Sequence, residues 1–442
     1  MFHYYIMASS SHSTIYIDPS YNSANFRSEF RLPKSNGIYL PDMRILNVGI
    51  EKTNTGGTSY NILAGSYGVI DSIQIYSGSQ LIDQVLHFSE WMAVKALLHS
   101  NNENQSVHRV LSRNKLGWVS AGDDQITVNT GVVTQAVIQS NQVPNQFNFV
   151  YGSDGTALTK PQNGGWLDLR QVFGFLKSST YIPMNVYPDL RIVLNYKNAA
   201  KQIDMMKDRA GTYTTLEPLL VCEYEADPAV ADELMRQYKG VAFTSVEHDQ
   251  LQYVASAPAT NGELAQTASY ITKAFNDKFI SKLLIVNTPE DKTTWVSGTD
   301  NTEIANQGSV SQLDWELQAR VNGVNWFPQV AYTGKNRRMG MMVDAWGDMN
   351  VAYGQNLCGV AQGAAKVFVA NAVDTMGQVD YTGFRIEEVV KELKLTLSRT
   401  AVGQNAAPAD NAALRQALHL NIFGLSRKRV VPTSNGILVQ YV

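Results

Sequence analysis

Residues 181–196 read YIPMNVYPDLRIVLNY, and the second half of this stretch alternates between apolar and polar side chains. In an extended chain, Leu190, Ile192 and Leu194 point to one side and the residues between them point to the other. This alternation predicts a β-strand with one buried face. The following residues, 197–213, lose the pattern and become polar. We therefore interpret the strand as the last one of a domain, with its three apolar residues in the core.

Most of the remaining chain also predicts short strands. The segments are rich in β-branched and aromatic residues, alternate with period two, and are bounded by Gly, Pro or Asn. Examples are STIYIDPSY, FRSEFRLP, MRILNVGIE, GVIDSIQIYSG, EPLLVCEYE, FISKLLIV, WELQARVNGVNWFP, KLTLSR, ALHLNIFGLS and GILVQYV. So many strands with few helices between them predict an all-β protein built of sandwiches or barrels.

Few segments predict helices. The clearest is DPAVADELMRQYKG (227–240), where Asp227 can cap, Pro228 suits the first helical position and Gly240 can close the helix. FSEWMAVKALLHS (88–100) and PADNAALRQAL are further short candidates.

The polar stretch divides the chain into two similar inventories of strands. We expect an arm at 1–13, a first domain at 14–200, a linker at 201–216 and a second domain at 217–442. Each half contains a comparable hairpin signal, Ser77-Gly78 in the first and Asn322-Gly323 in the second. The repetition indicates an internal duplication.

Composition narrows the class of function. The chain has 442 residues, of which 44% are hydrophobic and only 17% are charged, and its net charge is -3. The small negative charge argues against a protein that coats nucleic acid. The low charge content suits a surface that packs against copies of itself, a carbohydrate-binding protein or a secreted β-protein. Cys222 and Cys358 stand far apart, and we expect buried free thiols.

Catalytic signatures are weak. The sequence has no GxGxxG, GxxxxGK, HExxH or GxSxG motif. His108 and His248 could belong to a site assembled in space, and Asp314 with Glu316 could supply an acid and a base from one face of a strand. A lone histidine in a β-protein is much more often structural, and an exposed strand edge with Trp315 in the core accounts for the acidic pair. We expect no enzyme activity, no cofactor and no metal.

Other residues are candidates for subunit contacts, where aromatic residues and Arg are enriched. They come from the aromatic start MFHYYIM, from tryptophans near loops, and from the basic clusters KNRR and RKR. The candidates are Phe2, Tyr4, Tyr5, Trp295, Trp326, Arg337, Arg338, Arg427 and Arg429.

The segment 166–196, WLDLRQVFGFLKSSTYIPMNVYPDLRIVLNY, resembles the closing passage of the first jelly roll in double jelly-roll major capsid proteins. The segment 68–98 is similar to the hairpin and helix in the middle of that domain. NGILVQYV resembles the last strand of the second jelly roll, with Ile437 and Val439 in its core. These proteins form the shells of tailless icosahedral double-stranded DNA viruses of the adenovirus, virophage, polinton-like and giant-virus lineage.

The resemblance implies two tandem jelly-roll β-sandwiches with a few short helices in loops. It further implies a homotrimeric, pseudo-hexagonal capsomer that tiles the facets of a virion. The partners would be neighbouring capsomers, a penton protein and minor or cement proteins, with a membrane beneath the shell in some members and no sequence-specific nucleic-acid binding. The chain would be assembled inside the host cell. Low charge content fits such contacts, because unpaired charges buried at an interface are costly.

Two other functions remain open at this point. One is a tandem β-sandwich binding module, either carbohydrate-binding or adhesin-like, which exposed aromatic residues along one groove and a monomeric state would favour. The other is a β-rich hydrolase around Asp314, Glu316 or His248, which would require these side chains to converge in a cleft.

Overall fold

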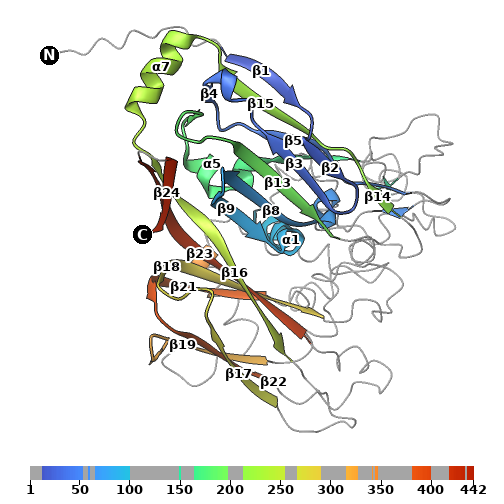
Figure 1. Ribbon diagram of the computed structural model, residues 1–442. Coiled ribbons are helices and arrows are strands. Elements are labelled where there is room, and N and C mark those ends of the chain that lie inside the picture. The colour runs from blue at the N-terminus through green and yellow to red at the C-terminus, as the bar shows by residue number, and fades with distance from the viewer. Residues whose placement is uncertain are drawn as a thin grey trace, which may run out of the picture.

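The computed structural model describes a large part of the chain. The described residues are 12–52, 58–59, 65–99, 149–150, 164–197, 213–253, 266–289, 315–326, 341, 344–346, 381–399, 418–433 and 436–442. They form two β-sandwich units (Figure 1).

In the part of the chain that the structure describes, the first unit contains strands, three short 3-10 turns and two helices before a connecting helix. The strands are β1 (His12–Ile17), β2 (Tyr21–Ser23), β3 (Arg27–Arg31), β4 (Ile38–Tyr39), β5 (Arg44–Val48), β6 (Ile50–Lys52), β7 (Thr58–Ser59), β8 (Ile70–Ser77), β9 (Gln80–Leu86), β10 (Phe149–Val150), β11 (Gly165–Asp168), β12 (Ile182–Pro183), β13 (Leu190–Tyr196), β14 (Tyr213–Thr215) and β15 (Leu219–Glu225). The 3-10 turns are Lys34–Asn36, Ser66–Val69 and Leu169–Gln171, and the helices are α1 (Phe88–His99), α5 (Gly174–Ser178) and the connecting α7 (Pro228–Gln237).

The second unit is made of longer strands. They are β16 (Val241–Tyr253), β17 (Gln266–Thr272), β18 (Lys278–Pro289), β19 (Trp315–Val321), β20 (Val324–Asn325), β21 (Tyr381–Val390), β22 (Leu393–Arg399), β23 (Leu418–Thr433) and β24 (Gly436–Tyr441).

Each unit has two main sheets, which we name A and B in the first unit and C and D in the second. Sheet A contains the order β1-β15-β5-β11, with β4 and β12 continuing from β15, and sheet B has the order β2-β3-β13-β8-β9. Sheet C has the order β16-β23-β18-β21, with β24 also paired to β23, and sheet D has the order β17-β22-β19-β20. All of these pairings are antiparallel.

The two units repeat one strand order. The main strands of the first unit can be numbered one to eight as β1, β3, β5, β8, β9, β11, β13 and β15, and those of the second as β16 to β23. Sheets A and C then both read 1-8-3-6, and sheets B and D both read 2-7-4-5. This order is that of an eight-stranded jelly roll with two Greek keys. The internal duplication is therefore visible in the topology.

This numbering corrects two expectations. Strand β13 pairs with β3 and β8 inside the first unit, but it is the seventh strand and not the last. The last strand is β15, which pairs with β1 and β5, whereas residues from 217 onward were expected in the second domain. An alternating pattern shows that a strand has one buried face but does not show which sheet receives it. We propose that the first domain ends at Glu225 and that α7 joins it to the second.

Two smaller expectations also change. Strand β1 begins at His12, inside the arm expected at 1–13. Strand β24 is an addition beside β23, and β23 is the eighth strand of the second unit.

The expected turns and the helices expected at 227–240 and 88–100 are confirmed, whereas PADNAALRQAL lies outside the described residues apart from Leu418, which begins β23. Gly78 joins β8 to β9 with φ +57°, and Asn322 and Gly323 join β19 to β20 with φ values of +53° and +81°. Both hairpins connect the fourth and fifth strands of their units. Helix α7 follows Asp227, whose carboxylate accepts a hydrogen bond of 2.9 Å from the Ala229 amide. Among the described helices, none has the length and apolarity needed to cross a membrane.

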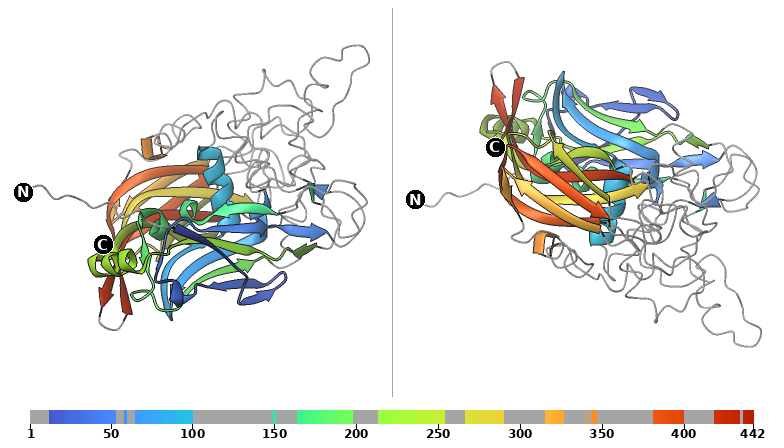
Figure 2. Two further views of the ribbon diagram at one scale, coloured as in Figure 1. Left: turned by 90° about the horizontal axis from the view of Figure 1, so that it is seen from above. Right: turned by 90° about the horizontal axis from the view of Figure 1, so that it is seen from below.

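The apolar cores follow the strand periodicity. Leu190, Ile192 and Leu194 are fully buried between sheets A and B, and Cys222 is a buried free thiol in the same core. A second core lies between sheets C and D around residues such as Leu283 and Ile422. The views in Figures 1 and 2 place sheet A and sheet D at opposite ends of the molecule, with sheets B and C meeting in the middle.

Candidate assembly surfaces

The first surface of interest is the seam between the two units. On one side it is formed by β9, α1 and α5, and on the other by β16, β23 and β24. The core of the first unit continues across this seam, because Phe243, Phe423 and Val430 of the second unit belong to the same apolar cluster.

A buried charged cluster crosses the seam. The Ser245 hydroxyl donates a 2.6 Å hydrogen bond to Asp83 of β9, and Lys428 Nζ donates to Ser245 Oγ at 3.0 Å. Lys428 also lies 2.7 Å from Glu247, which Lys278 contacts on its other oxygen at 2.7 Å. Two carboxylates are thus matched by two lysines. A buried charge without a partner would be strongly unfavourable.

The cluster shifts the ionisation of its members. Burial raises the pKa of Asp83 to about 6, although Ser245 and Lys428 act in the opposite direction. Burial would also raise the pKa of Glu247, but Lys428 and Lys278 hold it below its ordinary value. For Lys428, burial is outweighed by Glu247, and its pKa lies above the ordinary value. At neutral pH Lys428 and Glu247 are therefore charged.

The C-terminal strand covers this cluster. The Tyr441 hydroxyl lies 3.3 Å from Glu247, and Lys278 and Lys428 lie 4.7 and 5.0 Å from the centre of its ring. Cations attract the face of an aromatic ring, and this attraction is strengthened when water is excluded. Ile437 and Val439 are partly buried and pack on the core of the first unit. Strand β24 therefore belongs to the second unit by pairing and contacts the first by its side chains.

Aromatic rings fill the middle of the seam. His87 stacks on His248 with 4.2 Å between ring centres, and Trp91 of α1 lies 5.3 Å from Phe423. His248 Nε2 is 3.1 Å from Asn421 Oδ1. Burial, together with the neighbouring His87, lowers the pKa of His248 to about 4, so the ring is neutral at neutral pH.

One glycine allows the closest approach of the units. A Cβ atom at Gly174, in the first turn of α5, would lie 1.7 Å from the Thr244 carbonyl oxygen. Phe175, the next residue, meets Phe243 of β16 edge-on at 5.8 Å. A side chain at position 174 would force α5 away from β16.

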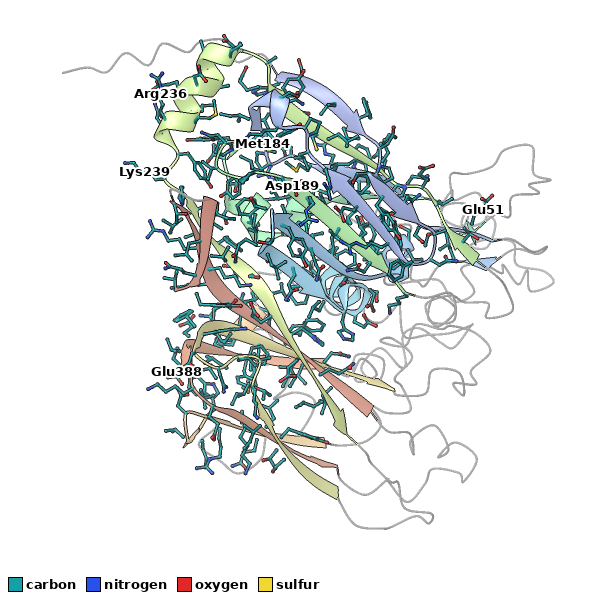
Figure 3. The ribbon with its side chains drawn as sticks, viewed as in Figure 1. Glu51, Met184, Asp189, Arg236, Lys239 and Glu388 are labelled. Carbon is teal, nitrogen blue, oxygen red and sulfur yellow. The ribbon has the colours of Figure 1, made fainter. Side chains whose placement is uncertain are left out.

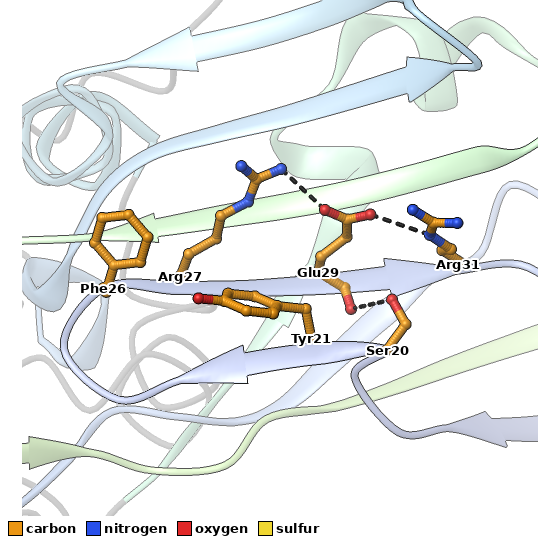
Figure 4. Close-up of a pocket in the computed structure, with 6 residues that line it drawn as sticks. All are labelled: Ser20, Tyr21, Phe26, Arg27, Glu29 and Arg31. Carbon is orange, nitrogen blue, oxygen red and sulfur yellow. Dashed lines mark hydrogen bonds and ion pairs between the residues drawn. The ribbon is translucent and has the colours of Figure 1, made fainter.

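The outward face of sheet B holds a separate polar surface. A hollow of about 470 Å³ lies over β2 and β3 (Figure 4) and is lined by Ser20, Tyr21, Phe26, Arg27, Glu29 and Arg31. Glu29 contacts Arg27 at 2.9 Å and Arg31 at 3.1 Å, and Arg191 approaches it at 3.4 Å. Burial would raise the pKa of Glu29, but the arginines hold it below its ordinary value. The charges of this face are thus paired within the chain.

No protein-family model and no curated protein sequence matches this chain. Solved structures do match. A model of the PBCV-1 virus capsid has a TM-score of 0.57 and 11% identity over 98% of this chain and 97% of that one. A structure of the Sputnik virophage has a TM-score of 0.52 and 10% identity over 100% and 91%, and the mavirus major capsid protein has 0.50 and 8% over 100% and 92%.

The fold is a double jelly roll. Coverage of nearly the whole chain means that both units are matched by these capsid structures. The expected fold class is confirmed. At such low sequence identity, the likeness establishes the fold alone. The function must be argued from further features of the structure.

The predicted contact residues are distributed unevenly over the double jelly roll. Arg427 and Arg429 are exposed on β23, and Arg427 lies over the ring of Phe279 at 4.3 Å. Trp326 is partly buried and packs on the second core. Phe2, Tyr4, Tyr5, Trp295, Arg337 and Arg338 lie outside the described residues, as do His108, Asp314 and Cys358. Glu316 belongs to β19, but its side chain is outside the description.

The hydrolase candidates do not form a described site. His248 stacks on His87 and lies within hydrogen-bond distance of Asn421 at the seam. Within the described ranges, no group of three or more His, Cys, Asp or Glu side chains could hold a metal ion.

Sequence reasoning missed the seam cluster. Its clearest signal was the RKR cluster, since a period of two places Arg427 and Arg429 on one face of a strand and Lys428 on the other. Lys428 is buried, as are Asp83 and Glu247. The strand period thus predicted a charged residue at an inward position, but the partners of Lys428, which are Ser245 and Glu247, lie far earlier in the chain, Ser245 by 183 residues.

Proposed function

We propose that this double jelly roll is a major capsid protein. It forms a homotrimer with six jelly rolls, and these capsomers tile the facets of an icosahedral virion shell. The observation that carries the proposal is the alignment of nearly the whole chain, both units together, with capsid structures. A tandem β-sandwich binding module would also contain two sandwiches, but the alignment of both units together with capsid structures favours the capsid role.

The seam supports this function physically. A building block of a shell must keep its two units at one angle, and apolar contacts alone are not directional. Here hydrogen bonds and ion pairs between Asp83, Ser245, Lys428 and Glu247 fix one arrangement. Buried polar groups can impose such specificity at some cost in stability.

The partners of the capsomer follow from the same proposal. They are neighbouring capsomers, a penton protein at the vertices and minor or cement proteins, and the chain resides in the virion. In this role the chain acts through assembly and has no catalytic step.

Electron microscopy of the purified full-length chain tests the proposal. We expect discrete particles with three copies and a roughly hexagonal outline. Particles containing a single elongated chain, at every concentration examined, would contradict it and would favour the tandem binding module.

A further inference from the structure

The outward face of sheet A is unusually apolar for a sheet surface. An antiparallel sheet at the protein surface normally presents polar residues to water. Here the side chains that point away from the core of sheet A include Tyr16, Leu46, Trp166, Leu219, Val221 and Arg44. Tyr16 is 64% exposed and Trp166 is 38% exposed.

These residues form one continuous patch across four strands. Val221 is paired with Tyr16 on one side and with Arg44 on the other. Leu219 is paired with Leu46. The Arg44 guanidinium lies over the Trp166 ring at 5.4 Å. Tyr, Trp and Arg are the residues that most often dominate the energy of protein interfaces.

Sheet B of the same unit provides an internal comparison. Its outward face carries Arg27, Glu29, Arg31 and Arg191, which pair with one another. Val193, at an outward position among them, is fully buried beneath these polar side chains. The outward face of sheet B therefore combines paired charges with the exposed rings of Tyr21 and Phe26, whereas the outward face of sheet A is mainly apolar.

The second unit contains a sheet equivalent to sheet A, and there the outward face is covered. Sheet C has the same strand order as sheet A, with β16 and β23 in the places of β1 and β15. The outward face of sheet C contains the paired residues Val246 and Leu425, and His248 and Phe423. These side chains are covered by the first unit, through its core cluster and through His87 and Trp91. The face that is covered in the second unit is open in the first.

We propose that the patch on sheet A is covered by the second unit of another copy of this chain. Inside one chain, the fifth strand of the first unit, β9, lies against the first strand of the second unit, β16. Repeating this relationship between copies places the fifth strand of the second unit, β20, against β1 of the next copy. Val324 of β20 is 67% exposed, so both sides offer an exposed apolar side chain.

The charges on the two faces agree with this pairing. The outward face of sheet D carries Lys394 and Arg320, which are register neighbours. The outward face of sheet A carries Glu223 and Asp168 in addition to Arg44. A basic face thus meets a more acidic one, which favours the correct orientation of the copies.

The geometry also bears on the number of copies. Sheets A and D lie at opposite ends of the molecule (Figure 1), so the contact is head-to-tail. Head-to-tail contacts close into a ring or continue as a filament, whereas a contact of sheet A with itself gives a two-fold dimer. This inference rests on the proposed trimer and assigns the residues that form its contacts.

Sedimentation velocity of full-length variants tests the assignment. Tyr16→Glu and Trp166→Glu each place a charge in the patch, and Val324→Glu places one on the opposing strand. We expect each to raise the concentration of half-assembly by at least about tenfold, as hot-spot substitutions do. Tyr21→Glu is the control, because it changes an exposed aromatic residue on the polar sheet B and should leave assembly unchanged.

Each result has a separate meaning. Assembly of Tyr16→Glu and Trp166→Glu at the wild-type concentration, from a wild-type protein that is trimeric, overturns the assignment and leaves the proposed function intact. Loss of assembly in these variants but not in Val324→Glu overturns the pairing with β20. A wild-type chain that is monomeric at all concentrations overturns the proposed function itself. Thermal unfolding of each variant, unchanged for these exposed sites, shows that loss of assembly is not loss of folding.

Discussion

The Asp83 carboxylate of the first jelly roll accepts a 2.6 Å hydrogen bond from the Ser245 hydroxyl of the second. Both residues are buried, and the same hydroxyl accepts from Lys428. This chain of contacts connects the units through groups that must be correctly oriented. It connects two sandwiches joined by a helix through buried polar contacts.

Replacing Lys428 should strongly destabilise the chain. Lys428→Met leaves Glu247 and Asp83 buried without their shared cation, and we expect the free energy of unfolding to fall by about 3–5 kcal/mol. Urea denaturation measures the change. Lys239→Met is the matched control, because Lys239 is exposed in the segment between α7 and β16 (Figure 3) and should change stability by less than about 0.5 kcal/mol. Equal stability of the two variants would show that the cluster does not hold the units.

The histidine at the seam should make the chain sensitive to acid. The pKa of His248 is about 4 in the fold, against an ordinary value of 6.5, so the unfolded chain binds its proton first as the pH falls. Compared with His248→Gln, the wild type should lose about 3 kcal/mol of stability between pH 6.5 and pH 4. Denaturation of both proteins across this range gives the difference. A difference that stays constant with pH would rule out a buried neutral imidazole.

Asp83 should have the opposite effect on how stability changes with pH. Its pKa is about 6 in the fold, against an ordinary value of 3.8, so the folded chain holds the proton more tightly. The stability that this group contributes is present below pH 3.8 and is lost as the pH rises to 6. Compared with Asp83→Asn, the wild type should therefore lose about 3 kcal/mol between pH 4 and pH 6. The same denaturation series measures it, and a gain over this range would contradict the prediction.

The two groups together have a consequence for the wild type. Their effects cover nearly the same pH window and have opposite signs. The seam as a whole should therefore change little in stability between pH 4 and pH 6, and each variant should reveal the contribution that the other group normally cancels.

Gly174 should tolerate no side chain. Gly174→Ala would place Cβ 1.7 Å from the Thr244 carbonyl oxygen, and the units must separate to accommodate it. We expect a loss of at least about 3 kcal/mol, in the range of severe overpacking. Gly78→Ala is the control, since its φ is +57° and nothing lies within 4 Å of the added atom. It should cost only about 1 kcal/mol of backbone strain. Thermal unfolding compares the two, and equal losses would refute the close approach.

The sequence predicted local features well and long-range partners poorly. The hairpins at Gly78 and Asn322-Gly323 and the cap at Asp227 were predictable, because turn and cap chemistry acts over a few residues. The place of β15 was not, because its alternating pattern fits either domain. Lys428 is the intermediate case. Its inward position follows from the strand period, but the identity of its partners depends on how two distant strands meet.

The most direct test of the central claim is the mass of the purified full-length chain in solution, measured by light scattering over a range of concentrations. An assembling capsid protein of this fold should give discrete particles of three times the 48.9 kDa chain mass. A mass of 48.9 kDa at every concentration would contradict the account.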